Sequence, residues 1–185
     1  LYAVNEGGLK WKTPLSAVAN SSPAIGNGKV YIGMGSEVLG FNLTNGTKEW
    51  QFGGGGALTD PTIGLDGTIY VGSFNNDKVF AANSSTGDKI WDFSSHEMYS
   101  ALSVGSDGIV YFGAEDEKVY ALDGEKGSKV WEYDTEGYIS GSAVLSSNGT
   151  LYIASDHFLY AIKTSSSGPI NSPWPMFGQN AQRTG

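Results

Sequence analysis

The sequence predicts an all-β fold in which a four-stranded antiparallel sheet recurs about every forty residues. Three observations lead to this prediction. Tryptophans recur at a constant interval, Asn-Gly or Asp-Gly pairs recur at the same interval, and the short apolar runs between them lack helical periodicity. The tryptophans are separated by 39, 41 and 40 residues, at Trp11, Trp50, Trp91 and Trp131. We therefore treat the 185-residue chain as an array of one repeated unit.

The first two strands of each unit are joined by a dipeptide that suits a two-residue hairpin turn. Asn-Gly and Asp-Gly tolerate the positive φ angles of such a turn. The pairs are Asn27-Gly28, Asp66-Gly67, Asp107-Gly108 and Asn148-Gly149. A short strand is expected before each pair. The strand after it carries a tyrosine, at Tyr31, Tyr70, Tyr111 or Tyr152.

A third strand follows, and a glycine-containing turn leads from it to a fourth strand that carries the tryptophan. The third strands are expected at 1–4, 38–42, 78–82, 118–122 and 158–162. The glycine lies four residues before the tryptophan, at Gly46, Gly87 and Gly127. A tryptophan on the last strand suits a contact between sheets, and its indole N–H can reach a carbonyl of the next unit. We expect these four tryptophans and three glycines to dock one sheet on the next.

Four short strands per unit at this period are typical of the blades of a β-propeller, which pack face to face. We predict a single domain, 1–185, with about four to five repeats. The complete blades are 22–52, 60–93 and 100–133. The remaining segments are a partial blade at 1–12, a partial blade at 140–162 and a C-terminal extension at 163–185.

An array of this length leaves an unpaired sheet edge and a bare blade face, which favours association. Two outcomes are open: a partial ring that a second copy completes by oligomerisation, or closure within one chain by pairing of 1–12 with 140–154. The chain starts at Leu1 without a signal-peptide pattern, and its first residues already read as a strand. We expect it to be a piece of a longer protein, cut inside a repeat.

Charge and composition exclude several kinds of partner and site. The formal net charge is -8 and the basic residues are dispersed, whereas binding to nucleic acid depends on clustered lysine and arginine. No apolar stretch is long enough to cross a bilayer. The sequence has no cysteine, which removes disulfides, thiolate metal sites and cysteine nucleophiles. We expect no nucleic-acid partner and no transmembrane segment.

The last complete unit contains Ala121 and Asp123 followed by Gly127 and Trp131, in the pattern Ala-x-Asp-x-x-x-Gly-x-x-x-Trp. This pattern resembles the tryptophan-docking motif of the pyrroloquinoline-quinone-like (quinoprotein-type) β-propeller repeat family. The Val-Tyr-Ala-Leu segment at 119–122 and the Trp-Pro-Met-Phe segment at 174–177 are also similar to segments of that family. The resemblance covers nearly the whole chain and implies a ring with more blades than this chain contains.

The resemblance implies two kinds of function. Some members are dehydrogenases that hold the quinone over the propeller axis beside calcium, and others bind no cofactor. Here Glu115, Asp116 and Glu117 lack the alternating spacing of a calcium loop, and His96 and His157 occupy different repeat positions. We therefore expect no catalytic, cofactor-binding or metal-binding residues. Pyrroloquinoline quinone and calcium would be expected only if the parent protein were a dehydrogenase.

The favoured function is a non-catalytic binding or scaffold module for protein–protein interaction in the cell envelope. The resemblance implies a protein partner and an extracytoplasmic location, which means periplasmic, cell-surface or secreted. Two alternatives stay open: a fragment of a quinone-dependent dehydrogenase, and a propeller that binds a small molecule or carbohydrate. Tyr99 and Tyr138 are the candidates for contact with a ligand or partner, because they precede first strands and are less tied to the repeat.

Overall fold

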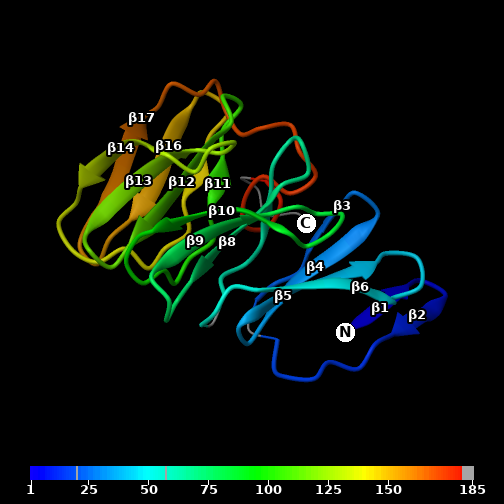
Figure 1. Ribbon diagram of the computed structural model, residues 1–185. Coiled ribbons are helices and arrows are strands. Elements are labelled where there is room, and N and C mark those ends of the chain that lie inside the picture. The colour runs from blue at the N-terminus through cyan, green and yellow to red at the C-terminus, as the bar shows by residue number, and fades with distance from the viewer. Residues whose placement is uncertain (20, 57, 181–185) are drawn as a thin grey trace.

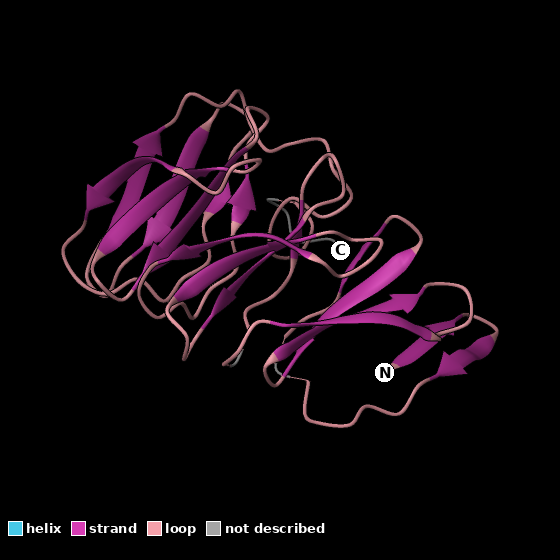
Figure 2. Cartoon of the chain, in the orientation of Figure 1, coloured by secondary structure: helices cyan, strands magenta, loops and turns pink. Residues whose placement is uncertain are grey.

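Strands are the regular elements of this protein. The computed structural model describes residues 1–19, 21–56 and 58–180, and within these ranges it contains strands joined by turns and loops, without a helix. Figure 2 shows the strands in magenta. The predicted all-β class is confirmed. The end of the predicted C-terminal extension, 181–185, lies outside the described residues.

Among the described residues, three four-stranded sheets lie between two smaller ones. The N-terminal sheet contains β1 (Tyr2–Asn5) and β2 (Gly8–Lys12). Sheet I contains β3 (Ala24–Gly26), β4 (Lys29–Met34), β5 (Glu37–Asn42) and β6 (Lys48–Gly53). Sheet II contains β7 (Thr62–Ile63), β8 (Ile69–Ser73), β9 (Lys78–Ala82) and β10 (Lys89–Ser94). Sheet III contains β11 (Ser103–Val104), β12 (Ile109–Ala114), β13 (Lys118–Asp123) and β14 (Lys129–Asp134). The C-terminal sheet contains β15 (Val144–Leu145), β16 (Thr150–Ala154) and β17 (Leu159–Lys163).

Each sheet is antiparallel with its strands in chain order, so its turns fall at two opposite ends. We call one the hairpin end, because it carries the turns between first and second and between third and fourth strands, such as 64–68 and 123–128. The opposite end is the linker end. It carries the turns between second and third strands and the connections between sheets, such as 95–102.

The first hairpin turn differs from the others. Asn27 and Gly28 both have positive φ, 52° and 72°, and Gly26 pairs with Lys29 across the predicted two-residue turn. In sheet II only Gly67 of its pair has positive φ, and Asp66 Oδ1 accepts a hydrogen bond from the Thr68 amide at 2.9 Å. The Asp66 carboxylate favours this wider turn. The amides of Gly105 and Ser146 close the same kind of turn by donating to the carbonyls of Ile109 and Thr150, at 2.9 Å. The prediction of a two-residue turn is therefore wrong at 66–67, 107–108 and 148–149.

A β-bulge directly precedes the tryptophan in each fourth strand. In sheet III, Trp131 pairs with Ala121 while Lys129 pairs with Leu122, so the ladder skips Val130. The same shift occurs at Ile90 in sheet II. A bulge adds one residue to a strand and increases its local twist. Val130 and Ile90 are consequently about half exposed, at 53% and 48%.

The core is a series of apolar layers between successive sheets. One layer joins sheets I and II through residues such as Tyr31, Ile63 and Phe80. A second layer joins sheets II and III, and a third joins sheet III to the C-terminal sheet. The faces between successive sheets are therefore buried, which is the packing expected of propeller blades.

The array is open in this chain. Figure 1 shows the sheets following one another from the blue N-terminal sheet to the orange strands β16 and β17. β1 pairs with β2, and β16 has β15 and β17 as its neighbours. The alternative in which 1–12 pair with 140–154 is therefore wrong, because β17 occupies the place beside β16 that such pairing needs.

The C-terminal extension lies along the first strands of the sheets. The amides of Ile63 and Val104 donate to the carbonyls of Trp174 and Pro175, at 2.7 and 2.9 Å. The Ile170 amide donates to the Val104 carbonyl at 2.9 Å. Residues 168–177 thus satisfy backbone groups on the edges of β7 and β11, which would otherwise lack protein partners.

Candidate functional site

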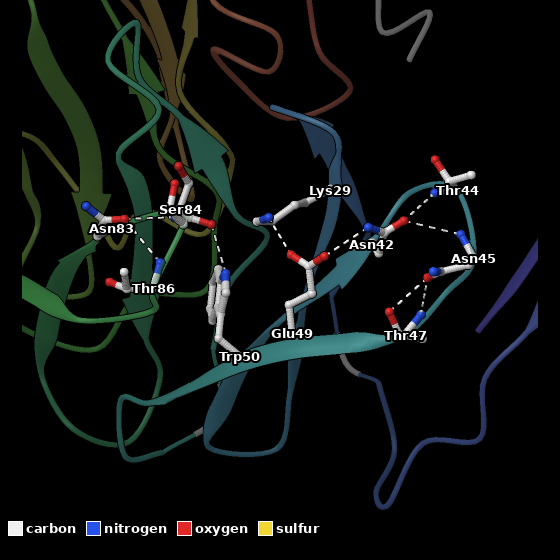
Figure 3. Close-up of polar contacts among 11 residues, drawn as sticks. Lys29, Asn42, Thr44, Asn45, Thr47, Glu49, Trp50, Asn83, Ser84 and Thr86 are labelled. Carbon is white, nitrogen blue, oxygen red and sulfur yellow. Dashed lines mark hydrogen bonds and ion pairs between the residues drawn. The ribbon is translucent and has the colours of Figure 1, made fainter.

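Three tryptophans donate a hydrogen bond to a backbone carbonyl of the next sheet. In Figure 3, the Trp50 indole of sheet I reaches the Ser84 carbonyl of sheet II, at 2.8 Å. The two equivalent bonds are Trp11 to Leu43 at 3.0 Å and Trp91 to Gly124 at 2.9 Å. All three indoles are at least 90% buried. Each indole N–H is therefore satisfied by the turn between the third and fourth strands of its neighbour.

The same turns place a glycine against each indole. A Cβ atom on Gly46 would lie 2.5 Å from Trp11, one on Gly87 would lie 2.7 Å from Trp50, and one on Gly127 would lie 2.6 Å from Trp91. These glycines have φ angles of 72°, 77° and 69°. Close approach and positive φ both call for glycine here. Each contact joins the tryptophan of one unit to the glycine of the next unit. In the sequence motif, by contrast, the glycine and the tryptophan belong to the same unit.

An acceptor side chain shapes each of these turns. Asn42 Oδ1 accepts from the Thr44 amide at 2.9 Å, and Asn83 Oδ1 accepts from the Thr86 amide at 3.2 Å (Figure 3). Asp123 does the same for the Glu125 and Lys126 amides, at 3.0 and 2.9 Å. These amide hydrogen bonds, that from Lys126 above all, hold the pKa of the Asp123 carboxyl below its usual range.

Trp131 has a different environment from the other three tryptophans. It is half-buried and packs beside Tyr111 with the ring centroids 5.9 Å apart. No described residue accepts a hydrogen bond from its indole. At the position that glycine holds in the neighbouring turns, the C-terminal sheet has Ser167.

The repeated tyrosines are packing residues in the three four-stranded sheets. Tyr31 and Tyr111 are fully buried and Tyr70 is 4% exposed. Tyr70 and Trp91 of the same sheet lie side by side, with the ring centroids 5.7 Å apart. The packing interpretation is confirmed for these three tyrosines. Tyr152 of the C-terminal sheet differs, because its ring faces outward and is 39% exposed.

Tyr99 and Tyr138 both lie at the linker end and are 46% and 55% exposed. The Tyr99 ring packs edge-on against Phe74 of the preceding sheet, with the centroids 4.1 Å apart. Its hydroxyl donates to Glu97 at 3.0 Å. Desolvation, together with hydrogen bonds to Glu97 and Glu115, raises the pKa of Tyr99. Tyr99 is therefore an exposed aromatic ring held between the turns of two consecutive sheets.

The carboxylate loop at the linker end has a structural role. Asp116 Oδ2 accepts a hydrogen bond from the Tyr120 hydroxyl at 2.5 Å and lies 3.8 Å from His96 Nε2. His157 belongs to a different turn, between β16 and β17. In the described ranges, no group of three or more His, Cys, Asp or Glu side chains could hold a metal ion.

A family model described as outer membrane protein assembly factor BamB matches residues 54–168. Among solved structures, BamB from Moraxella catarrhalis is similar, with a TM-score of 0.71 and 19% identity over 86% of this chain. The chain spans about half of that protein, 51% of its length. The comparison with curated proteins finds no match for this sequence.

Two further solved structures share this arrangement of sheets. The WD40 β-propeller domain of Doa1 has a TM-score of 0.71 and 16% identity, over 89% of this chain and 57% of that one. The computationally designed Ika4 protein has a TM-score of 0.70 and 13% identity, over 84% of this chain and 98% of that one. At these identities the likeness shows a common fold, the β-propeller.

Proposed function

This chain belongs to the PQQ-like β-propeller repeat family, whose matching model is described as outer membrane protein assembly factor BamB, and from this premise we propose that it is a non-catalytic protein-binding scaffold of the cell envelope. We also propose an extracytoplasmic location, since the matching family model is described as an outer membrane protein assembly factor. Within the described residues no helix has the length and apolar character needed to span a bilayer.

The observation that carries this proposal is the position of Tyr99. Its ring is 46% exposed, yet Phe74 and Glu97 hold it in one orientation. A rigid aromatic ring at a surface is a typical hot spot of a protein interface, because it contributes apolar contact without losing much conformational entropy on binding. Tyr138 presents a second exposed ring one repeat further along the same end. We propose that a protein partner binds across these two tyrosines.

The C-terminal extension bears on whether this chain would hold pyrroloquinoline quinone. In the dehydrogenases that the family resemblance implies, the quinone lies over the propeller axis, where first strands converge. Here residues 168–177 bond to the edges of β7 and β11, and the Pro173 ring lies against Gly26 of β3. Met176 is fully buried in the layer that contains β15. The chain's own extension therefore lies along the first strands, and this supports a function without the cofactor.

A pull-down from an envelope extract tests the binding site. We expect the wild-type chain to recover a defined partner and the Tyr99→Ala/Tyr138→Ala variant to recover about tenfold less. Tyr2→Ala is the matched control, because Tyr2 is also exposed, at 71%, but lies on β1. Equal recovery by both variants would exclude Tyr99 and Tyr138 as contacts. Repeated failure to recover any partner under gentle conditions would contradict the scaffold function.

A second experiment tests the non-catalytic part of the proposal. The protein is mixed with pyrroloquinoline quinone and calcium and passed through a gel-filtration column. We expect no quinone absorbance in the protein fraction and no dye-linked oxidation of alcohols or sugars. Retained quinone together with oxidation would make the dehydrogenase alternative correct.

A further inference from the structure

A hollow of about 730 Å³ opens at the hairpin end between sheet II and sheet III. Its apolar part includes Leu65 from sheet II, Ile109 from sheet III and Ile170 from the C-terminal extension. Leu65 is 68% exposed, so a large apolar side chain faces solvent at the edge of the hollow. A hollow of this size is in the range that binds ligands or a few side chains, about 300–1,000 Å³.

Carboxylates surround this apolar part. Asp66, Asp107 and Glu125 line the hollow and are exposed to solvent. The hydrogen-bond donors to Asp66 are the Thr68 amide and hydroxyl, and those to Asp107 include the Ser165 hydroxyl at 2.7 Å. These donors are neutral, so they orient the carboxylates without cancelling their charge.

Cationic side chains are scarce around the hollow. None of its described lining residues is lysine, arginine or histidine. The nearby Lys126 pairs with Asp123, at 3.6 Å, and its side chain is 70% exposed. An ion pair that is open to water is weak, so Lys126 leaves the hollow with an excess of negative charge.

A glycine keeps the inner side of the hollow clear. A Cβ atom at position 124 would lie 2.8 Å from the Tyr70 hydroxyl and 2.5 Å from the Gly108 carbonyl, both of which line the hollow. Between sheets I and II, by contrast, the Ser84 and Asn27 side chains lie close over Gly67, within 2.9 Å of where its Cβ would be. The junction of sheets I and II therefore differs from that of sheets II and III at this position.

The negative charge acts inside the hollow as well as at its edge. The Tyr70 hydroxyl lies in its wall and donates to the Gly124 carbonyl at 3.1 Å. Burial raises the pKa of Tyr70, and the charges of Asp66 and Asp123 raise it further. A positively charged group in this position would meet a favourable field.

We propose that this acidic hollow binds a basic and apolar segment of a partner protein. A lysine or arginine side chain of the partner lies among Asp66, Asp107 and Glu125, and an adjacent apolar side chain packs on Leu65. Charge complementarity selects this occupant, and the apolar part favours a peptide over an isolated cation. The inference rests on the proposed function as a protein-binding module, to which it adds a second surface and the chemistry of its ligand.

Fluorescence anisotropy with a short labelled peptide of alternating arginine and leucine tests the site. We expect the triple variant Asp66→Asn/Asp107→Asn/Glu125→Gln to bind the peptide about tenfold more weakly than wild type. Each amide replacement keeps one oxygen acceptor for its turn, and an unchanged urea midpoint would show that the fold is intact.

A matched variant separates this site from general charge attraction. Glu6→Gln/Glu136→Gln/Asp156→Asn removes the same number of exposed carboxylates at other places, and we expect less than about a twofold loss of affinity. Leu65→Ser should weaken binding of the arginine–leucine peptide but leave binding of an arginine–glycine peptide unchanged. Equal losses in the two triple variants would overturn the inference, because net charge alone would then explain the binding.

The two proposals fail in different ways. If the envelope partner and the arginine–leucine peptide both bind the Asp66/Asp107/Glu125 variant as well as they bind wild type, the hollow is not a binding site, although the module binds protein. If no envelope partner is recovered at all, the proposed function itself is wrong.

Discussion

At the scale of single residues, the junction between sheets II and III depends on two aromatic side chains of sheet II that contact the backbone of sheet III. Trp91 of sheet II donates to the Gly124 carbonyl and lies against Gly127, both in sheet III. Tyr70 donates to the same carbonyl at 3.1 Å. One backbone oxygen is therefore the acceptor for two aromatic side chains of the neighbouring sheet. We propose that this arrangement is a main source of rigidity in the array.

Trp91→Ala should lower the free energy of unfolding by about 3–5 kcal/mol, because it leaves a cavity between sheets II and III. Trp91→Phe should cost less, but it removes the indole donor, which is worth about 1 kcal/mol. Urea unfolding followed by circular dichroism measures both values. A loss below about 1 kcal/mol for Trp91→Ala would mean that Trp91 does not dock the sheets.

Gly127→Ala should destabilise the protein more than Gly108→Ala does. Both glycines belong to sheet III and have positive φ, 69° and 77°, so the backbone cost of the substitution is similar. A Cβ at 127 would meet Trp91 at 2.6 Å, whereas one at 108 has no atom within 4 Å. The difference between their unfolding midpoints isolates the contact with Trp91. Equal midpoints would contradict the steric role of Gly127.

Asp123→Asn should be tolerated at neutral pH, since Asn42 and Asn83 hold the same turn in sheets I and II. The two proteins should differ in acid. Folding lowers the pKa of Asp123, so its carboxylate contributes stability above its ordinary pKa of about 3.9 and loses that contribution as pH falls through the folded-state value. The wild type should therefore lose stability relative to Asp123→Asn below about pH 4. Unfolding curves from neutral to acidic pH test this, and a constant difference would contradict it.

At the scale of elements, three junctions between sheets contain an aromatic pair in addition to the tryptophan. Phe52 of β6 packs on Phe80 of β9, with the centroids 5.5 Å apart. Phe93 and Tyr120 are 5.9 Å apart at the next junction, and Tyr133 and Tyr160 are 6.0 Å apart at the last. Each pair joins a fourth strand to the third strand of the following sheet. The bulge before the tryptophan is repeated in the same way, so both features belong to the repeat.

The C-terminal extension is an element of a different kind, because it contacts several sheets at once. Removing residues 169–185 should expose the edges of β7 and β11 and accelerate hydrogen exchange at the amides of Ile63 and Val104, which donate to the extension. Exchange measured by NMR gives the protection of each amide. A synthetic peptide with the sequence of 169–180 should restore it, and unchanged protection in the truncated protein would show that the extension does not bind these strands.

At the scale of the whole molecule, the chain is a stack of sheets in which the C-terminal sheet has a bare face. Leu159 and Tyr152 of the C-terminal sheet are 72% and 39% exposed, whereas their counterparts in sheet III, Val119 and Tyr111, are fully buried against the next sheet. Exposed apolar surface of this kind favours association. We propose that this face packs on another blade.

The 185-residue chain should therefore self-associate as its concentration rises. Leu159→Lys should shift the equilibrium toward monomer by placing a charge on the bare face, without disturbing a buried layer. Light scattering over a range of concentrations measures the molar mass. Val18→Lys is a control at a residue that is 76% exposed and lies outside the strands. A monomer at all concentrations for the wild type would contradict this proposal.

The sequence by itself determined the class of fold and the order of the strands. A repeat imposes the same local pattern in every unit, so the tryptophan interval and the turn dipeptides identify the sheets without knowledge of long-range contacts. It also marked Trp91 and Gly127 as members of the repeated docking motif, in two consecutive units. It did not reveal the bulges, since a bulge depends on how a strand pairs, nor the wider turn at Asp66, which depends on a side-chain hydrogen bond.

The tertiary structure alone decided what lies where different units meet. The extension at 168–177 binds β7 and β11 across more than sixty residues of chain, and no local pattern encodes that pairing. The same holds for Tyr99 against Phe74, and for the acidic hollow, where Leu65 and Glu125 from two turns meet Ile109 at the start of β12. Packing between blades follows from the repeated sequence pattern. Surfaces available for binding arise where individual side chains differ from that pattern.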